Sequence, residues 1–178
     1  MLKRLITVVL ACLALHAPAE EPAPVRTVPE VDIQRYLGSW YEIAAFPMFF
    51  QRQCIADTQA RYDLDEKGGI RVHNQCATSS GIDKAEGRAK VVEGSGNAKL
   101  RVSFFWPFWG DYWILALQPD YQWALVGSPT RKYLWLLSRT PSLPAEELQK
   151  ALEAAKAQQF DISQLRYTPQ SAVARAAQ

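Results

Sequence analysis

Few side chains in this 178-residue chain are of the kinds that carry enzymatic chemistry. The chain has two histidines, and His16 lies in an apolar N-terminal segment. His73 therefore stands alone, on the strand face opposite Ile70 and Val72, where a surface histidine is expected and a haem or metal ligand is the alternative. A zinc site needs three or four clustered ligands, and a nucleophilic serine or cysteine needs a positioned imidazole. We expect no catalytic residue, no metal and no cofactor.

Phosphate and nucleic-acid binding are also disfavoured. The segment Gly94–Asn97 is followed by neither the lysine nor the helix of a phosphate-binding loop, and it is typical of a hairpin turn. The formal charge of +2 includes Lys3 and Arg4 of the apolar leader, so the chain without them has a net charge of 2 − 2 = 0. Nucleic acids bind clustered lysine and arginine. We therefore expect no nucleic-acid partner.

The N-terminus has the pattern of an export signal. A basic start is followed by the apolar run Leu5–Leu15 and by Ala17-Pro18-Ala19, and the run is shorter than the ~20 residues needed to span a bilayer. Residues 1–19 are predicted to be a signal peptide and residues 20–30 a linker. The alternative is a lipoprotein signal that ends before a lipidated Cys12. Either version places the protein in the periplasm or at the outer membrane.

Without Cys12, the chain keeps two cysteines, Cys54 and Cys76. In an oxidising compartment a pair that flanks one hairpin is most simply a disulfide, worth roughly 3 kcal/mol by the loop-entropy relation. Two free buried thiols are the alternative. The two positions are not symmetric about the turn near Lys67, so a bulge or loop position must absorb the difference.

The remaining chain consists mainly of short alternating runs separated by turns. Residues 32–37 are predicted to form one helical turn, capped by Asp32 and ended by Gly38. A helix begins near Pro144, Leu165–Tyr167 adds a short strand, and residues 169–178 form a disordered tail. Eight strands are expected at residues 40–46, 54–64, 70–76, 87–93, 98–104, 112–118, 123–128 and 132–139. The pattern predicts an all-β, eight-stranded antiparallel up-and-down β-barrel over residues 31–168, with the α-helix packed outside.

Three motifs in order make the chain resemble the lipocalin family. They are Gly38-Ser39-Trp40, Pro119-Asp120-Tyr121 and the arginine that ends the last strand, Arg139. The wider matches, such as Tyr133–Pro141, resemble the bacterial outer-membrane lipocalins and their relatives of the apolipoprotein D type. We expect Gly38, Trp40, Asp120, Tyr121 and Arg139 to be structural, with the Arg139 guanidinium over the Trp40 ring at the closed end of the barrel.

The open end and the interior are the expected binding site. Strand counting from Trp40 places the connections after residues 46, 76 and 104 at the open end. Residues predicted to face a ligand are Glu42, Phe46, Tyr62, Phe104 and Trp135. An apolar rim at the mouth is predicted from Phe49, Phe50, Trp106, Phe108 and Trp109, because Pro107 and Gly110 favour an exposed turn.

The resemblance and the apolar interior together predict a protein that binds and carries or stores lipids, such as fatty acids or lysophospholipids, for maintenance of the cell envelope. It is expected not to be an enzyme. The alternative is a lipocalin-type enzyme that uses Glu42 and Tyr62 on a lipophilic substrate. Membrane association through Cys12 or the rim, and a homodimer, are left open.

Overall fold

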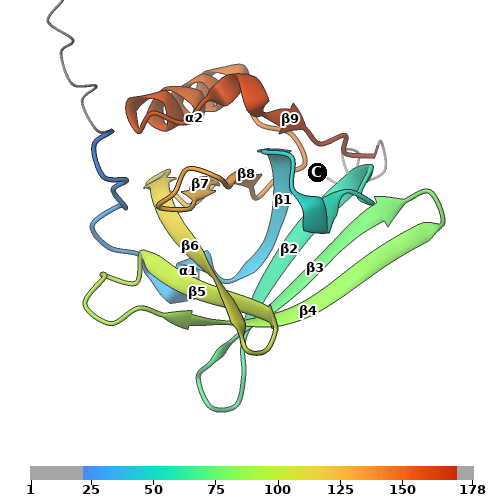
Figure 1. Ribbon diagram of the computed structural model, residues 1–178, viewed down its shortest axis with the longest axis horizontal. Helices are drawn as coiled ribbons and strands as arrows, with labels where there is room; N and C mark the ends of the chain where they lie inside the picture. The colour runs from blue at the N-terminus through green and yellow to red at the C-terminus, as the bar shows by residue number, and fades with distance from the viewer. Residues whose placement is uncertain (1–21, 172–178) are drawn as a thin grey trace, which may run out of the picture.

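The computed structural model describes residues 22–171, and Figure 1 shows a ring of strands with one long helix beside it. The strands are β1 (Gly38–Ala45), β2 (Ala56–Leu64), β3 (Ile70–Thr78), β4 (Gly81–Val91), β5 (Lys99–Phe105), β6 (Phe108–Leu117), β7 (Trp123–Gly127), β8 (Leu134–Ser138) and β9 (Arg166–Tyr167). The helices are α1 (Ile33–Tyr36) and α2 (Ala145–Ala157), with short 3-10 helices η1 (Phe49–Gln51) and η2 (Ile162–Gln164). Within residues 22–171, no helix is long and apolar enough to cross a membrane.

The sheet closes on itself. Each strand from β2 to β7 pairs with the next in antiparallel fashion, β8 pairs with β1, and β1 pairs with β2 and with β9. Neighbouring strands in the barrel are therefore also consecutive in the sequence, except where β8 pairs with β1 to close the ring. This is the predicted up-and-down barrel, and it is closed where β1 pairs with β2 over Gly38–Tyr41.

The closed end is organised by the helical turn before β1. Asp32 caps α1 by accepting hydrogen bonds from the backbone N–H groups of Gln34 and Arg35, as predicted. Gly38 then turns the chain into β1 with a φ of 89°, a conformation that glycine adopts without strain. The turn thereby delivers Trp40 to the inner face of the first strand.

The buried side chains form two groups on opposite faces of the barrel wall. The interior cluster lies inside the ring and includes Tyr36, Trp40, Tyr62, Val72, Leu100 and Ile114. The helix-side cluster lies between the wall and α2 and includes Ala44, Phe46, Leu125, Leu136, Ala151 and Phe160. Strand alternation, which sends successive side chains to opposite faces, separates the two.

Several predicted boundaries were wrong. The β3–β4 hairpin continues to Thr78 and Gly81, and β6 begins at Phe108 rather than at residue 112.

The predicted linker is packed along the barrel from residue 22: Val25 is buried, and the Val28 N–H donates to the Ile114 carbonyl. The predicted tail is ordered at its start, because Gln170 is buried at 4% exposure. Residues 1–21 and 172–178, including Cys12 and the whole predicted signal, lie outside the described residues.

Candidate functional site in the barrel interior

The floor of the barrel is formed by the predicted pair of Trp40 and Arg139. Trp40 has no exposed surface, and the Arg139 guanidinium carbon lies 3.7 Å from the centre of its ring. Arg139 also donates from Nη1 to the Ser39 carbonyl at 2.9 Å and from Nη2 to the Arg35 carbonyl at 2.6 Å. Since these contacts tie the last strand to the first and to α1, they close one end of the barrel.

The Asp120–Tyr121 turn supports the same end from outside. The Tyr121 hydroxyl accepts a hydrogen bond from the Asp32 N–H at 2.9 Å, and the Arg35 guanidinium lies 4.1 Å from the Tyr121 ring centre. The Asp120 carbonyl accepts a hydrogen bond from the Gln122 side chain. The Tyr121 ring also packs against the interior cluster, so this turn holds α1 against the floor of the barrel.

A continuous column of aromatic rings runs from this floor to the mouth. Neighbouring ring centres along it are 4.9 to 6.4 Å apart, within the range of favourable aromatic pairs. In order from the floor its members are Trp40, Tyr36, Tyr62, Tyr112, Trp135, Tyr133 and Phe50. Predicted ligand residues Tyr62 and Trp135 both belong to this column.

The upper part of the interior is accessible to solvent. Tyr112 and Trp135 pack on the interior cluster yet are only partly buried, as is Val102. Gly110 pairs with Val102, so it shares the inward face, and a Cβ added there would meet no atom closer than 3.9 Å. Inward-facing groups that still touch solvent line an open space. This space, the lumen, ends below at fully buried residues such as Trp40 and Val72.

Three tyrosine hydroxyls meet where the open lumen reaches the buried floor. The Tyr62 hydroxyl donates to the Tyr112 hydroxyl at 2.9 Å, and the Tyr36 and Tyr112 hydroxyls are 2.8 Å apart. Burial raises the pKa of Tyr62 to about 12 and the pKa values of Tyr36 and Tyr112 well above the usual value. All three phenols are therefore protonated near neutral pH.

Glu42 faces inward but its carboxyl group is held in the barrel wall. Its two oxygens accept hydrogen bonds from Gln51 Nε2 at 2.7 Å and Thr168 Oγ1 at 2.5 Å. Burial raises the pKa of this carboxyl, against the lowering effect of both hydrogen bonds. Both carboxylate oxygens accept hydrogen bonds from the protein, so Glu42 joins η1 to the C-terminal segment. This differs from the prediction that Glu42 faces a ligand.

The prediction that Phe46 faces the lumen was wrong. Phe46 belongs to the helix-side cluster, with its ring centre 6.3 Å from that of Phe160. The reason is a bulge in β1: Glu42 pairs with Leu137, but Ala44 pairs with Leu136, so one extra residue reverses the alternation. Phe104 keeps the inward alternation of Leu100 and covers Gly87, where an added Cβ would lie 2.8 Å from the Phe104 ring.

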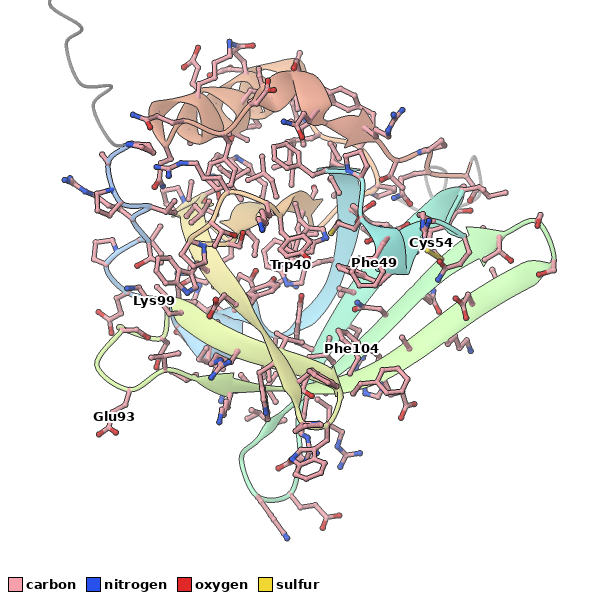
Figure 2. All side chains as sticks on the ribbon, viewed as in Figure 1. Trp40, Phe49, Cys54, Glu93, Lys99 and Phe104 are labelled. Carbon is pink, nitrogen blue, oxygen red and sulfur yellow. A yellow bond between two sulfur atoms is a disulfide. The ribbon has the colours of Figure 1, made fainter. Side chains whose placement is uncertain are left out.

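An apolar rim is present at the open end, with one member misplaced. Phe49, Trp106 and Phe108 are 70%, 76% and 75% exposed. Phe50 is 48% exposed, and Figure 2 shows Phe49 beside Cys54 at the start of β2. Trp109 was wrongly predicted in the rim: its ring lies on the outer face of β6, where the Lys90 ammonium lies 4.5 Å from the ring centre.

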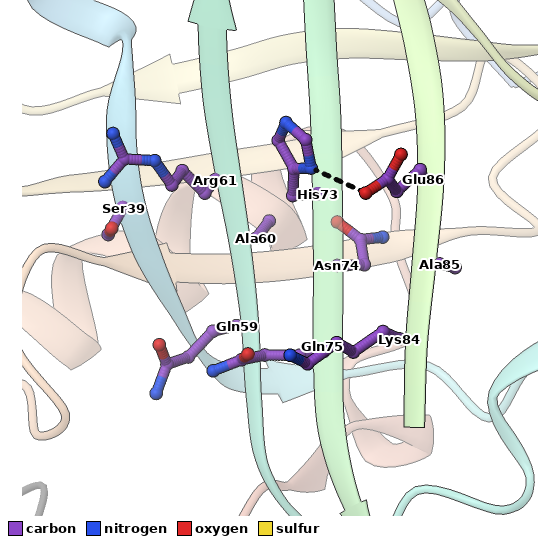
Figure 3. Close-up of a pocket in the computed structure, with 10 residues that line it drawn as sticks. All are labelled: Ser39, Gln59, Ala60, Arg61, His73, Asn74, Gln75, Lys84, Ala85 and Glu86. Carbon is purple, nitrogen blue, oxygen red and sulfur yellow. Dashed lines mark ion pairs between the residues drawn. The ribbon is translucent and has the colours of Figure 1, made fainter. Parts of the chain in front are cut away.

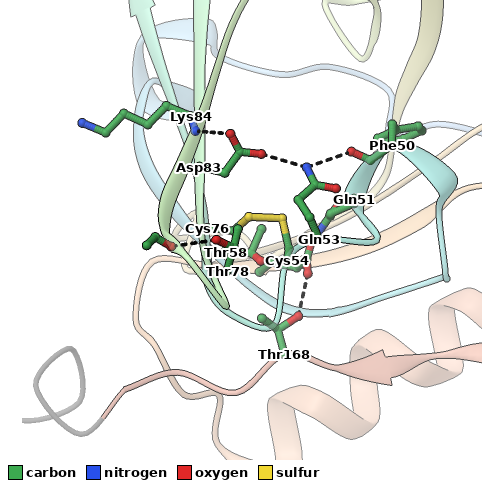
Figure 4. The surroundings of a disulfide bond; sticks show 12 residues. Phe50, Gln51, Gln53, Cys54, Thr58, Cys76, Thr78, Asp83, Lys84 and Thr168 are labelled. Carbon is green, nitrogen blue, oxygen red and sulfur yellow. Dashed lines mark hydrogen bonds between the residues drawn. A yellow bond between two sulfur atoms is a disulfide. The ribbon is translucent and has the colours of Figure 1, made fainter.

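A disulfide fastens the rim loop to the barrel. Cys54 and Cys76 are bonded, with Cα atoms 5.4 Å apart, as predicted. The asymmetry about the turn is absorbed by a bulge in β2 between Ala56 and Gln59, where Asp57 has a φ of 52°. Figure 4 shows a second link beside the disulfide, from Gln53 Nε2 to the Asp83 carboxylate at 2.9 Å. The segment carrying Phe49 and Phe50 is thus held against β3 and β4.

A second depression, of about 330 Å³, lies on the outer wall across β1 to β4. Figure 3 shows its lining, in which His73 Nδ1 lies 3.6 Å from a Glu86 oxygen. The side chains around it are the outward-facing ends of Arg61, Gln75 and Lys84, among others. A lining of flexible polar side chains suits water better than a hydrophobic ligand. We therefore place the candidate ligand site in the lumen.

Sequence reasoning missed Tyr36, Tyr112, Tyr133 and Gly110 as parts of the interior. Tyr112 pairs with Leu100, whose inward position was predicted, so the register of β5 on β6 would have identified it. The aromatic run from Phe104 to Trp113 concealed this signal, because the turn was predicted to be longer than it is. Tyr36 lies on α1, which strand alternation does not reach.

The lipocalin-like domain family matches residues 31–170 of the chain. The chain is 42% identical over 159 residues to temperature-induced lipocalin-1 of Arabidopsis thaliana, covering 85% of this chain and 86% of that protein. It is 40% identical over 174 residues to the outer membrane lipoprotein Blc of Escherichia coli K12, covering 94% of this chain and 98% of that protein. It is 33% identical over 167 residues to bovine apolipoprotein D, covering 87% and 81%.

Solved structures agree on the fold. Insecticyanin from the tobacco hornworm Manduca sexta aligns with a TM-score of 0.70 at 22% identity, over 84% of this chain and 86% of that chain. Lobster apocrustacyanin A1 aligns with a TM-score of 0.64 at 18% identity, over 79% and 80%. With the closed barrel, the Trp40–Arg139 floor and these matches together, the chain belongs to the lipocalin family.

Proposed function

We propose that this protein binds and carries or stores a lipid with a single acyl chain, a fatty acid or a lysophospholipid, inside the lumen. Membership of the lipocalin family implies a small hydrophobic ligand. The observation that carries the proposal further is the aromatic column, because its rings join a buried floor to an exposed mouth through partly exposed Tyr112 and Trp135. An elongated apolar molecule fits such a path.

The expected affinity follows from the buried chain. Burial of a twelve-carbon chain contributes about 10 kcal/mol at ~0.8 kcal/mol per methylene. Loss of translational and rotational freedom on binding opposes this by about 4 kcal/mol or more. We therefore expect a Kd in the micromolar range.

Within the lumen we assign chain contacts to Trp135 and Phe104, and contact with a polar group to Tyr62. Trp135 lies midway along the column, 6.4 Å from Tyr112 and 5.9 Å from Tyr133 between ring centres. Phe104 is 40% exposed on the inward alternation near the mouth. We assign no catalytic role, since Glu42, the one inward carboxyl considered for catalysis, is engaged by Gln51 and Thr168.

The test is titration of delipidated protein with lysophosphatidylcholine and with dodecanoic acid, followed by tryptophan fluorescence. Wild-type protein should saturate with a micromolar Kd for at least one of them. Trp135→Ala and Phe104→Ala should each weaken binding severalfold with unchanged far-UV circular dichroism. The absence of saturable binding to either amphiphile by folded wild-type protein would overturn the proposal.

We also propose that the rim contacts an anionic lipid surface during loading. Phe105, Trp106 and Phe108 protrude from the β5–β6 turn, and Arg88 and Arg101 lie on the neighbouring outer wall. Aromatic rings at a membrane interface and basic groups near phosphates favour this orientation. The double variant Trp106→Ser/Phe108→Ser should lose sedimentation with phosphatidylglycerol vesicles. Equal sedimentation of wild type and variant would contradict it.

For the location we propose the periplasm or the outer membrane, with a lipid anchor if Cys12 is the first residue of the mature chain. Two relatives from Escherichia coli and one each from Vibrio cholerae and Citrobacter freundii are named outer membrane lipoproteins, which supports this location. Mass spectrometry of protein recovered from native membranes distinguishes a lipidated Cys12 from a chain that begins at Glu20.

A further inference from the structure

We propose that the three tyrosines at the base of the lumen form a hydrogen-bonding site for the polar end of a long-chain acid or alcohol, which therefore enters the barrel polar end first. This tyrosine site consists of Tyr36, Tyr62 and Tyr112. The inference rests on the proposed function, and it adds the orientation of the ligand and the chemical group at its inner end.

The tyrosine site holds one more O–H proton than its own hydrogen bonds use. Three phenols carry three O–H protons, but the site contains only two oxygen–oxygen contacts, at 2.8 and 2.9 Å. Tyr62 donates to Tyr112, and one of Tyr36 and Tyr112 donates to the other. Whichever of these two donates, one proton remains without an acceptor among the described residues. Since burial keeps all three phenols protonated, the site offers one hydrogen bond to an incoming oxygen atom.

The three tyrosines differ in how far they are exposed. Tyr36 and Tyr62 are 3% and 6% exposed, whereas Tyr112 is only partly buried. Tyr112 is therefore the member that faces the open lumen. Its ring stacks with Trp135, which stacks with Tyr133 toward the mouth. An acyl chain whose polar end reaches Tyr112 would lie along these rings and leave through the rim.

A hydrogen-bond acceptor without a partner among the described residues lies near the tyrosine site. Asn74 pairs with Ala60, which pairs with Trp40, so Asn74 takes the inward alternation. Its side-chain oxygen is buried and has no hydrogen-bond partner within residues 22–171. Asn74 lies diagonal to Tyr62 across β2 and β3, a Cα separation of about 7–8 Å. A carboxylic acid or hydroxyl group accepts and donates at once, which matches a spare O–H and a spare oxygen.

The experiment compares two probes that must bind in opposite directions. Dodecanoic acid can enter polar end first, whereas the zwitterionic headgroup of lysophosphatidylcholine must stay in water at the mouth. Kd values are measured by fluorescence titration for wild type, Tyr112→Phe and the matched control Tyr167→Phe, which removes the hydroxyl of an exposed tyrosine on β9. Loss of one hydrogen bond in a desolvated site should weaken dodecanoic acid binding about tenfold in Tyr112→Phe. Lysophosphatidylcholine binding should change by less than about twofold.

The outcomes separate this inference from the function it rests on. If wild type binds lysophosphatidylcholine but not dodecanoic acid, or if Tyr112→Phe weakens both probes equally, the tyrosine site is overturned while the carrier function stands. An unchanged Kd for dodecanoic acid in Tyr112→Phe also overturns it. If wild type binds neither probe, the carrier function itself fails.

Discussion

At the scale of single residues, Glu42 is a carboxyl group buried in the barrel wall. It is 5% exposed, and no cation is paired with it; its partners are the neutral side chains of Gln51 and Thr168. Burial raises the pKa of the carboxyl above 4.5, so the folded protein retains this proton at pH values where the unfolded chain has lost it. The stabilising contribution is complete below 4.5 and is lost as pH rises through the higher folded pKa.

We therefore predict that Glu42→Gln removes a pH-dependent loss of stability. Thermal unfolding of wild type and variant should be measured between about pH 4 and pH 8, the range where a raised carboxyl pKa acts. The melting temperature of the wild type should fall relative to that of the variant as pH rises above 4.5. A difference that stays constant over the whole range would show that Glu42 does not titrate as inferred.

The floor pair should matter for stability and not for ligand choice. Trp40→Ala removes a fully buried indole and should cost about 3–5 kcal/mol of unfolding free energy. Arg139→Ala removes the guanidinium that covers this ring and two hydrogen bonds, so it should also lower stability. Chemical denaturation measures both. A change in ligand preference in Arg139→Ala at an unchanged melting temperature would mean that the barrel opens at the opposite end.

Sequence reasoning located inward residues where strands are regular and failed where a bulge intervenes. Counting by twos from Trp40 or Arg139 correctly places Tyr62 and Trp135, since the intervening registers are unbroken. It fails for Phe46, which follows the bulge after Glu42. A bulge depends on the pairing of strands that are distant in the sequence, so the residue types within β1 do not predict it.

At the scale of elements, the C-terminal segment after β9 completes the wall. β1 pairs with β2 only over Gly38–Tyr41 and with β9 over Ala44 and Ala45, so β1 and β2 separate toward the mouth. The Gln170 side chain spans this gap, with Nε2 donating to the Glu42 carbonyl at 2.9 Å and to the Thr58 carbonyl at 3.4 Å. Composition predicted a disordered tail there, because a single bridging side chain leaves no periodic pattern.

We predict that Gln170→Ala destabilises the mouth by leaving two backbone carbonyls without their donor. The expected loss is about 1–3 kcal/mol. Amide hydrogen exchange should accelerate at the mouth-side ends of β1 and β2 and not at the floor near Trp40. Gln149→Ala, an exposed change on α2 far from the seam, is the matched control. Uniform acceleration throughout the barrel, or none, would contradict a local role.

At the scale of the whole molecule, the proposed ligand binding requires an open lumen above a closed floor. Gly110 gives direct access to this space: it faces inward on β6, has room for a side chain and does not have a positive φ. Its neighbour Asp111 pairs with Arg101 on the outer face. The same substitution therefore places a side chain in the lumen at Gly110 and on the outer surface at Asp111.

The measurement that tests the central claim most directly is lysophosphatidylcholine binding by Gly110→Leu and Asp111→Leu beside wild type. All three proteins are delipidated, and folding is verified by circular dichroism. We expect wild type and Asp111→Leu to saturate with the same micromolar Kd and Gly110→Leu to lose at least tenfold in affinity, since its side chain takes the place of the ligand. Equal binding by folded Gly110→Leu would show that the ligand does not occupy the lumen.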